Sequence, residues 1–304
     1  MTSQRASRLE RRERALAHRA AQTPVSPAPE HLRVATWNLN SIRSRLPALE
    51  RFVDRTEPDI VCLQETKVSD LPDDAVAMLT RRGYEIAHTG AGGYNGVAIV
   101  ARHDISDIER SGSFGDEHLD REPRLVTCKV HTDQVVRVAS VYVPHGRTLE
   151  HWHFQYKLAF IEALSARVSH WLTEGGAVVI AGDVNVAPTD SDVFHPDAFV
   201  GLTHVTPAER NALGRLLEAG LVDVDAACWG SHARRFTWWN YGTGYSTNLG
   251  MRIDLIAADQ RLATTLSTTW IDHGERGAQR ASDHAALVAD FARLDRIENP
   301  VNAK

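Results

Sequence analysis

The first part of the chain alternates between short runs with the two-residue period of strands and longer runs with the helical period. Residues 32–37 and 59–64 are β-rich apolar runs that predict strands, whereas the apolar positions of residues 45–57 predict a helix. Further strand runs, residues 96–101, 124–130 and 135–143, succeed one another with no helical stretch between them. Because parallel strands need a long crossover connection, at least part of the sheet structure is expected to be antiparallel.

The rest of the chain continues this alternation. Residues 149–173 predict a long helix ended by Gly175 and Gly176, and the wholly apolar run 177–181 predicts a strand buried on both faces. Thr206, Pro207 and Glu209 form a capping box with proline in the first turn, so a helix should run from there to Gly220. Strand runs follow at residues 236–241, 252–257, 268–271 and 285–291. No linker or repeat divides residues 31–293, which predict one α/β domain followed by a C-terminal tail, residues 294–304.

Composition indicates the class of protein and its surroundings. The 304 residues are 43% hydrophobic, enough for a substantial core, and no apolar run approaches the ~18 residues that span a bilayer. Residues 1–30 combine arginines with a proline-rich segment and predict a disordered basic tail; a transient basic helix over residues 8–21 that touches DNA is the alternative. No apolar segment of a secretory signal follows the arginines, so a cytoplasmic protein without a membrane partner is expected.

The cysteine content and the net charge limit the possible compartment and surface character of the protein slightly. Cys62, Cys128 and Cys228 lie far apart without metal-ligand spacing, which fits a reducing compartment. Cys62 and Cys128 stand in apolar strand runs and are expected to be buried side chains without a function. The formal net charge of -5 argues against a surface coated in positive charge, but it leaves room for a local phosphate-binding strip.

Polar residues fall repeatedly at the ends of the predicted strands. They are Asn38 and Asn40, Gln64 and Glu65, Asp183 and Asn185, Asp254 within the run 253–256, and Asp283 and His284 before the last strand. A lone Asn or Asp at such a place is usually a turn former or a helix cap. Recurrence at several strand ends, with carboxylate, amide and imidazole groups, indicates instead a cleft that holds a hard cation through oxygen ligands.

Short sequence blocks in a fixed order point to a known family. They are WNLNSIR at 37–43, LQETK at 63–67, YNGVAI at 94–99, VYVP at 141–144, GDVNVAP at 182–188, FTWW at 236–239, RID at 252–254 and SDH at 282–284. On these blocks the chain resembles the exonuclease III and apurinic/apyrimidinic (AP) endonuclease branch of the endonuclease/exonuclease/phosphatase superfamily, its bacterial members in particular. The resemblance spans about residues 32–292. It implies a four-layer α/β fold, a two-sheet β-sandwich core flanked by helices.

The resemblance also implies roles for the strand-end residues. Glu65 would bind Mg²⁺, for which Mn²⁺ could substitute, with Asn38, Asn40 and Asp283 completing or supporting the shell. Asp183 would take a proton from the attacking water that Asn185 orients. His284, held by Asp254, would contact the phosphate. Tyr142 would either donate to the scissile phosphate or help to activate the nucleophile, and a second metal at Asp183, Asn185 and His284 stays open.

The expected substrate is double-stranded DNA with abasic sites or 3′ ends, bound by a monomer. By the same resemblance, Trp238, Met251 and Ile253 would line a pocket for a base-less sugar, although a plain core role stays open for Ile253 and for Trp239. The predicted phosphate contacts are Arg43, Lys67, His145 and Arg147. Two positions depart from the family pattern: His145 stands where relatives usually carry Asn or Gln, and Asn40 where some carry Asp.

These expectations describe a DNA repair nuclease that incises 5′ of abasic sites and removes nucleotides or blocking groups from 3′ ends. Two rivals remain. One is another phosphodiesterase of the superfamily, such as a deoxyribonuclease I-like nuclease or a phosphoinositide or sphingomyelin phosphatase, which would share the residues of the metal site. The other is a catalytically silent DNA-binding scaffold. The balance between the activities is not predicted by the sequence.

Overall fold

The computed structural model describes residues 31–110 and 114–292. Both predicted tails, residues 1–30 and 294–304, lie outside the described residues, so their predicted character stays a prediction. Within the described ranges, no helix combines the length and the apolar character that crossing a membrane requires.

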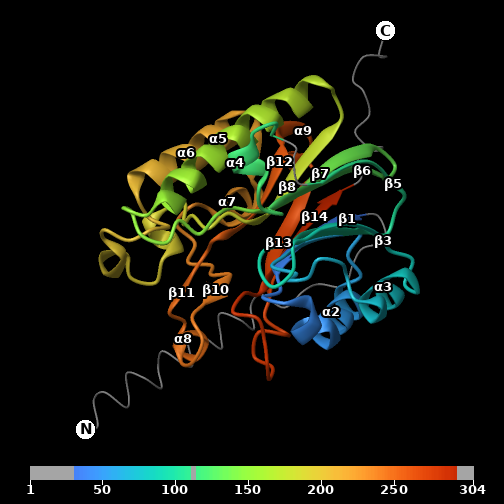
Figure 1. The fold of residues 1–304 in the computed structure, drawn as a ribbon, viewed down its shortest axis with the longest axis horizontal. Helices are drawn as coiled ribbons and strands as arrows, with labels where there is room; N and C mark the ends of the chain where they lie inside the picture. The colour runs from blue at the N-terminus through green and yellow to red at the C-terminus, as the bar shows by residue number, and fades with distance from the viewer. Residues whose placement is uncertain (1–30, 111–113, 293–304) are drawn as a thin grey trace.

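Two six-stranded sheets form the centre of the molecule (Figure 1). The first has the order β13 (Leu266–Asp272), β14 (Ala286–Ala292), β1 (His31–Asn38), β2 (Ile60–Gln64), β4 (Val97–Ala101), β3 (Glu85–Thr89). The second has the order β5 (Ile105–Glu109), β6 (Leu125–His131), β7 (Val135–Tyr142), β8 (Ala177–Asp183), β12 (Asp254–Asp259), β9 (Leu221–Asp223). Each sheet contains one parallel pair, β1 with β2 and β7 with β8, and its other pairs are antiparallel. The expected antiparallel component is therefore confirmed.

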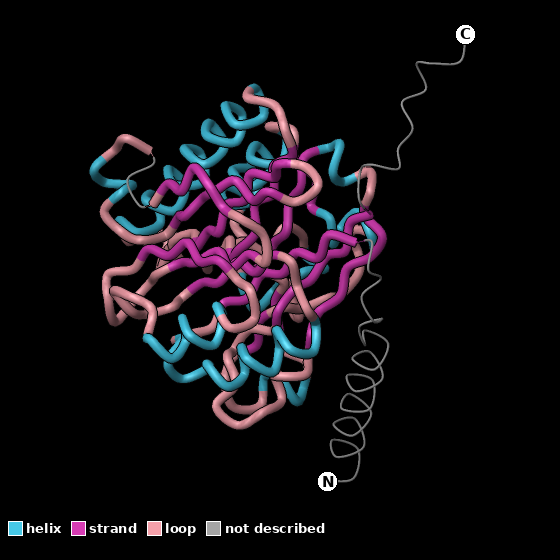
Figure 2. The backbone as a smooth tube through the Cα atoms, turned by 90° about the vertical axis from the view of Figure 1, so that its right-hand side faces the viewer, coloured by secondary structure: helices cyan, strands magenta, loops and turns pink. Residues whose placement is uncertain are grey.

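Helices cover the outer faces of both sheets. The crossover between β1 and β2 is α2 (Ile42–Thr56), which packs beside α3 (Asp73–Thr80), and the crossover between β7 and β8 is α5 (Trp152–Thr173), which packs beside α6 (Pro207–Glu218). The shorter elements are α4 (Glu117–Asp120), η1 (Asp190–Asp192), η2 (Pro196–Phe199), α7 (Val224–Trp229), β10 (Trp238–Trp239), α8 (Gly244–Thr247), β11 (Gly250–Met251) and α9 (Gln260–Ala263). Figure 2 shows the resulting succession of helices, two sheets and helices.

The buried side chains form separate clusters between these layers. In β8, Val179 and Ala181 belong to the cluster between the sheets, whereas Val178 and Ile180 belong to the cluster under α5 and α6. Because alternate residues of a strand point to opposite faces, a strand covered on both sides must be apolar throughout, as predicted for this one. The predicted two-sheet sandwich flanked by helices is confirmed.

Two predictions about the elements were wrong. The expected strand over residues 236–241 is reduced to β10, because the chain turns at residues 241–243. β10 pairs with β11, and its Trp238 forms an isolated bridge with His284. The segment between β5 and β6, expected to hold no helix, contains the single turn α4, whose cap Asp116 accepts from the His118 and Leu119 amides. The capping box of Thr206 and Glu209 is confirmed.

Candidate active site

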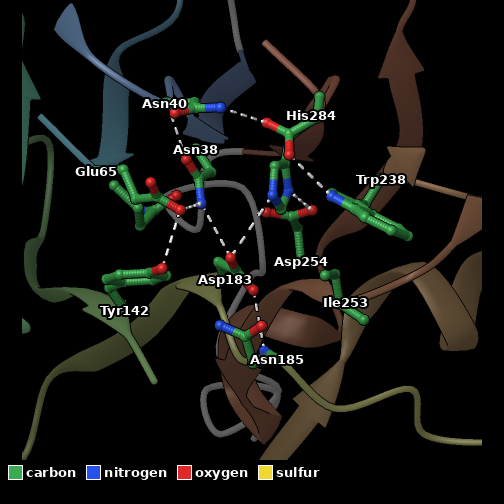
Figure 3. Close-up of polar contacts among 12 residues, drawn as sticks. Asn38, Asn40, Glu65, Tyr142, Asp183, Asn185, Trp238, Ile253, Asp254 and His284 are labelled. Atoms are coloured by element: carbon green, nitrogen blue, oxygen red, sulfur yellow. Dashed lines mark hydrogen bonds and ion pairs between the residues drawn. The ribbon is translucent and has the colours of Figure 1, made fainter. Parts of the chain in front are cut away.

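The strand ends of the two sheets meet at one edge of the sandwich. Asn38 ends β1 beside the end of β2, and Asp183 ends β8 directly opposite Asp254, the first residue of β12. The buried amide of Asn38 joins the two groups, because its Nδ2 donates to Glu65 Oε1 at 2.9 Å and to Asp183 Oδ2 at 3.0 Å (Figure 3). The predicted cleft of polar strand-end residues is thus a single contiguous site.

The turns after these strands hold their side chains in left-handed backbone conformations. Asn40, Glu65 and Asn185 have φ values of 49°, 51° and 51°. Asn tolerates this region because its short side chain bonds locally, whereas Glu gains no such compensation. The backbone at Glu65 is therefore strained, and such strain clusters at functional sites, where the surrounding contacts maintain it.

Glu65 is surrounded by hydrogen-bond donors. The Tyr142 hydroxyl donates to Oε1 at 2.9 Å, and the Lys67 ammonium lies 2.8 Å from Oε2. Burial by itself raises the pKa of Glu65, but the donors Lys67 and Asn38 outweigh it and lower that pKa. Burial and the charge of Glu65 raise the pKa of Tyr142 well above its ordinary value, so its hydroxyl stays a donor.

The oxygen atoms around Glu65 fit a cation. Lys67 Nζ is 2.8 Å from Glu65 Oε2 and 2.5 Å from Asn40 Oδ1, so a carboxylate and an amide oxygen already converge on one positive charge. A hard divalent ion selects oxygens of these types. Lys67 was predicted as a phosphate contact; the structure directs its ammonium to Glu65 and Asn40, and the phosphate role stays a prediction.

Asp283 lies beside this group, held by its own set of donors. Asn40 Nδ2 donates to Asp283 Oδ1 at 3.0 Å, and the Trp238 indole donates to Oδ2 at 3.1 Å. Burial raises the pKa of Asp283, but the charge of His284 and these two hydrogen bonds outweigh burial and lower it. Asp283 is thus ionised at neutral pH, as a metal-linked carboxylate must be.

Asp254, His284 and Asp183 form the second part of the site. His284 Nδ1 lies 2.8 Å from Asp254 Oδ2, and its Nε2 lies 3.7 Å from Asp183 Oδ2. Burial lowers the pKa of His284, but the charge of Asp254 outweighs it and raises that pKa to about 10. Burial is also the main reason that the pKa of Asp183 rises to about 7. The site thus pairs a protonated imidazole with a carboxyl group poised to exchange a proton near neutral pH.

The open question of a second metal involves the same residues. Asp183, Asp254 and His284 each bring one ligand atom within 4.8 Å of the others, and Asp254 Oδ1 is buried without a hydrogen-bond partner. Asn185, named in the predicted second set, uses its Nδ2 to donate to the Val143 carbonyl at 2.9 Å. The second metal stays a prediction.

A pocket of about 400 Å³ opens beside these groups. Trp238, Met251 and Ile253 form its apolar wall together with Phe199, while Met251 and Ile253 are 2% and 4% exposed. Ile253 therefore serves both as a core residue and as part of the pocket wall. Trp239 is fully buried against the core between the sheets, in agreement with a structural role.

The remaining predicted contacts lie around the pocket. His145 and Arg147 line it with exposed side chains, and Arg43 is exposed in the first turn of α2. Both ring nitrogens of His145 are engaged: Nδ1 accepts from the Arg147 amide at 3.1 Å, and Nε2 lies 3.2 Å from His204 Nε2. His145 thus contacts its own loop and His204, and its phosphate contact stays a prediction.

The sequence did not identify several residues that hold the site. The Tyr241 hydroxyl accepts from Asn40 Nδ2 at 2.8 Å and from the Arg45 guanidinium at 3.0 Å. No local pattern indicates these contacts, because Tyr241 follows Asn40 by some two hundred positions. Lys157 and Glu209 lie beneath the Asn185 loop. Lys157 could have been noticed in the sequence as a charged residue on the apolar face of the predicted helix 149–173, whereas Glu209 was predicted only as part of the capping box.

Comparison with known proteins gives a consistent result. The sequence profile of the Endonuclease/Exonuclease/phosphatase family matches residues 35–284. Exodeoxyribonuclease III of Haemophilus influenzae is 28% identical over 271 residues, which cover 86% of this chain and 100% of that protein. An AP endonuclease from Archaeoglobus fulgidus has a similar structure, with a TM-score of 0.77 and 34% identity over 86% of this chain and 100% of that one. A 3′ phosphatase from Neisseria, bound to a product DNA hairpin, has a TM-score of 0.79 and 33% identity over 86% and 99%.

Proposed function

Because the chain belongs to the endonuclease/exonuclease/phosphatase family, in its exonuclease III and AP endonuclease branch, we propose that it is a DNA repair nuclease that hydrolyses phosphodiester bonds. The observation that carries the proposal is the convergence of Asp183, His284 and Glu65 on one edge of the sandwich, joined by Asn38. These groups supply a proton acceptor, a cationic donor and a metal-binding carboxylate, the parts that phosphodiester hydrolysis requires.

In this proposal each residue acts at a defined atom. Asp183 accepts the proton of the attacking water, and a pKa of about 7 matches that task at neutral pH. His284, protonated and oriented by Asp254, donates Nε2–H to a phosphate oxygen. Tyr142 donates as a neutral phenol, in agreement with its raised pKa. Of the two roles considered for Tyr142, the donor is the one supported.

The proposed cofactor is Mg²⁺, with Mn²⁺ as a substitute. Glu65 would hold it directly, with Asn40 and Asp283 beside it. When bound, it would neutralise charge on the non-bridging phosphate oxygens. Asn38 would support the metal-binding residues rather than bind the ion itself, because its Nδ2 donates to two carboxylates while its Oδ1 accepts the Asn40 amide at 3.0 Å. The fit of Glu65 and Asn40 oxygens around the Lys67 cation supports this assignment.

The proposed substrates are abasic sites and 3′ ends in double-stranded DNA, bound by a monomer. The support is the apolar wall of Trp238, Met251 and Ile253, which would accept a sugar without its base. Arg147 at the pocket rim would position the backbone without reading sequence. Sedimentation of the protein alone and with duplex would test the one-to-one stoichiometry.

The test is cleavage of end-labelled duplexes, one with an internal abasic site and one with a blocked 3′ end, with Mg²⁺ and with chelator. We expect metal-dependent cleavage of both, and almost none from Asp183→Asn, which keeps the shape of the side chain and removes the proton acceptor. Cleavage of soluble phosphate esters in preference to either duplex would favour the rival phosphatase. Duplex binding without any cleavage would favour the silent scaffold.

A further inference from the structure

A fully buried lysine lies beneath the loops that carry the site. Lys157 is on α5, and its ammonium donates to the carbonyl of Asn185 at 2.6 Å and to that of His145 at 3.3 Å. Asn185 follows β8 and His145 follows β7, the parallel pair that ends in Asp183 and Tyr142. One charged group thus holds the backbone of both loops.

Glu209 on the neighbouring helix α6 neutralises this charge (Figure 1). Its Oε2 completes the capping box by accepting from the Thr206 amide at 3.0 Å. Its Oε1 pairs with Lys157 and also accepts from the Thr203 hydroxyl at 2.6 Å and the His204 amide at 2.8 Å. Burial raises the pKa of Glu209, but Lys157 and these donors lower it to about 2. Glu209 is therefore ionised. Its Oε1 holds Thr203 and His204, which line the pocket.

A chain of two imidazoles adds a second connection to Asn185. The Arg147 amide donates to His145 Nδ1, so His145 carries its proton on Nε2 and directs it to His204 Nε2. His204 then carries its own proton on Nδ1, which lies 2.5 Å from the Asn185 carbonyl. With these protons, all four ring nitrogens of His145 and His204 have a hydrogen-bond partner while both rings are neutral. Burial lowers the pKa of His204 to about 3, in agreement with it.

We propose that Lys157 and Glu209 form a buried positioning pair, which fixes the Asn185 loop against the His145 loop and so sets the geometry in which Asn185 orients the reacting water. Neither residue touches the reacting atoms, and the inference rests on the nuclease function proposed above. The close packing at Gly146 supports it: a Cβ there would lie 2.6 Å from Thr203 Oγ1 and 3.2 Å from Lys157 Cδ, so the loop has no room to shift toward the pair.

The experiment replaces both charges together. Removing one partner would leave an unpaired buried charge and unfold the protein, whereas Lys157→Met with Glu209→Gln removes the pair at similar volume. We expect kcat on the abasic duplex to fall about 10- to 100-fold with KM within about two-fold, since a small misplacement of catalytic groups costs rates of this order. Hydrogen exchange at residues 183–187 and 143–147 should accelerate in the same variant. Glu209→Asp, which keeps the charge and withdraws it from Lys157, should change both measurements in the same direction to a smaller extent.

The matched control is the buried pair of Arg33 and Asp290, 2.8 Å apart, at the opposite end of β1 from Asn38. Arg33 also donates to a carbonyl, that of Thr56, at 2.6 Å. Arg33→Met with Asp290→Asn should lower the melting temperature and leave kcat unchanged at a temperature where the protein is folded. Equal losses of kcat in both double variants would mean that the Lys157 pair only supports the fold, and would overturn the inference.

Hydrogen exchange separates this inference from the proposed function. If the wild type cleaves neither duplex, the proposed function fails, and the exchange rates alone decide whether the pair holds the two loops. Unchanged exchange at residues 183–187 and 143–147 in the folded Lys157 double variant overturns the inference whatever the activity. Faster exchange there, absent from the Arg33 control, supports it.

Discussion

Asn38 carries no charge, yet its single amide links Glu65, which follows β2 of one sheet, to Asp183 at the end of β8 in the other. Through such links the site residues depend on one another, so the role of each is best separated by paired substitutions. Glu65 accepts from Asn38, Tyr142 and Lys67, and Asp283 accepts from Asn40 and Trp238.

Glu65→Ala should lower nuclease activity severely and leave the fold intact. The change removes the carboxylate proposed to hold the metal, and a higher Mg²⁺ concentration should restore part of the activity because the neighbouring oxygens remain. The measurement is the cleavage rate as a function of Mg²⁺, with Glu218→Ala at the exposed end of α6 as the control. Equal rates for Glu65→Ala and wild type at limiting Mg²⁺ would exclude the metal assignment.

Trp238 should set selectivity through its ring and support Asp283 through its indole N–H. Trp238→Phe keeps an apolar wall and loses the 3.1 Å hydrogen bond to Asp283, whereas Trp238→Ala loses both. The ratio of incision at an abasic site to incision at a matched undamaged nucleotide should drop roughly ten- to a hundred-fold in Trp238→Ala, because an apolar wall is worth ~1–3 kcal/mol. In Trp238→Phe that ratio should hold while the rates fall modestly. A constant ratio in both variants would make Trp238 a core residue only.

The predicted metal and catalytic residues share one property: each stands at or next to a strand end. Apolar runs that are easily recognised in the sequence precede Asn38, Glu65 and Asp183. Because strand ends meet at one edge in this fold class, the convergence of these residues could be predicted. Tyr241 and His204 stand in irregular segments, and contacts between such segments are fixed only by tertiary packing. For that reason Tyr241, His204 and the partner of Lys157 became visible only in the structure.

The first turn of α5 joins the helix to the His145 loop. His151 caps the helix, with its ring accepting from the His153 amide, and His153 Nδ1 accepts from the Gly146 amide at 3.1 Å. Burial, and then the charge of Arg124, lower the pKa of His153 to about 4. His153 must therefore stay neutral for the helix and the loop to remain joined.

This arrangement predicts an acid-sensitive helix start. A His side chain in the unfolded chain has a pKa of about 6.5. Below that pH the unfolded state therefore binds a proton that His153 does not bind in the folded state. The free energy of unfolding should then fall as the pH drops from about 6.5 to about 4, by about 2 kcal/mol at pH 5. His153→Gln keeps an acceptor for Gly146 without titrating, so it should lose less stability over this range. Denaturant unfolding of both proteins at pH 7 and pH 5 measures the difference, since all other groups titrate in both; parallel pH dependence would contradict the prediction.

Strands were predictable where the structure buries both of their faces. β1, β2, β4 and β8 are buried along nearly their whole length, and their apolar runs gave bounds within one or two residues. The strands that lack such a run, β3, β5 and β9, lie at sheet edges and were not predicted. An edge strand forms because the neighbouring strand offers hydrogen bonds to it, so its own sequence need not show a clear strand pattern.

At the scale of the whole molecule, residues 1–30 are predicted to add weak contact with DNA and nothing to catalysis. Deleting them should leave turnover near that of the full chain and slightly flatten the salt dependence of DNA binding, because fewer arginines would displace counterions. Filter binding across a salt series, together with single-turnover cleavage, gives both quantities. A truncated protein that is folded but inactive would refute the prediction.

The active site draws on both ends of the described chain. Asn38 closes the first strand, His284 precedes the last one, and β14 lies inside its sheet between β1 and β13. A ribosome that has not yet delivered β14 therefore carries a chain without its imidazole and with β1 unpaired on one side. Such a nascent chain cannot cut DNA, however much of it has already folded. Nuclease activity is therefore expected only after β14 has been synthesised and has paired with β1.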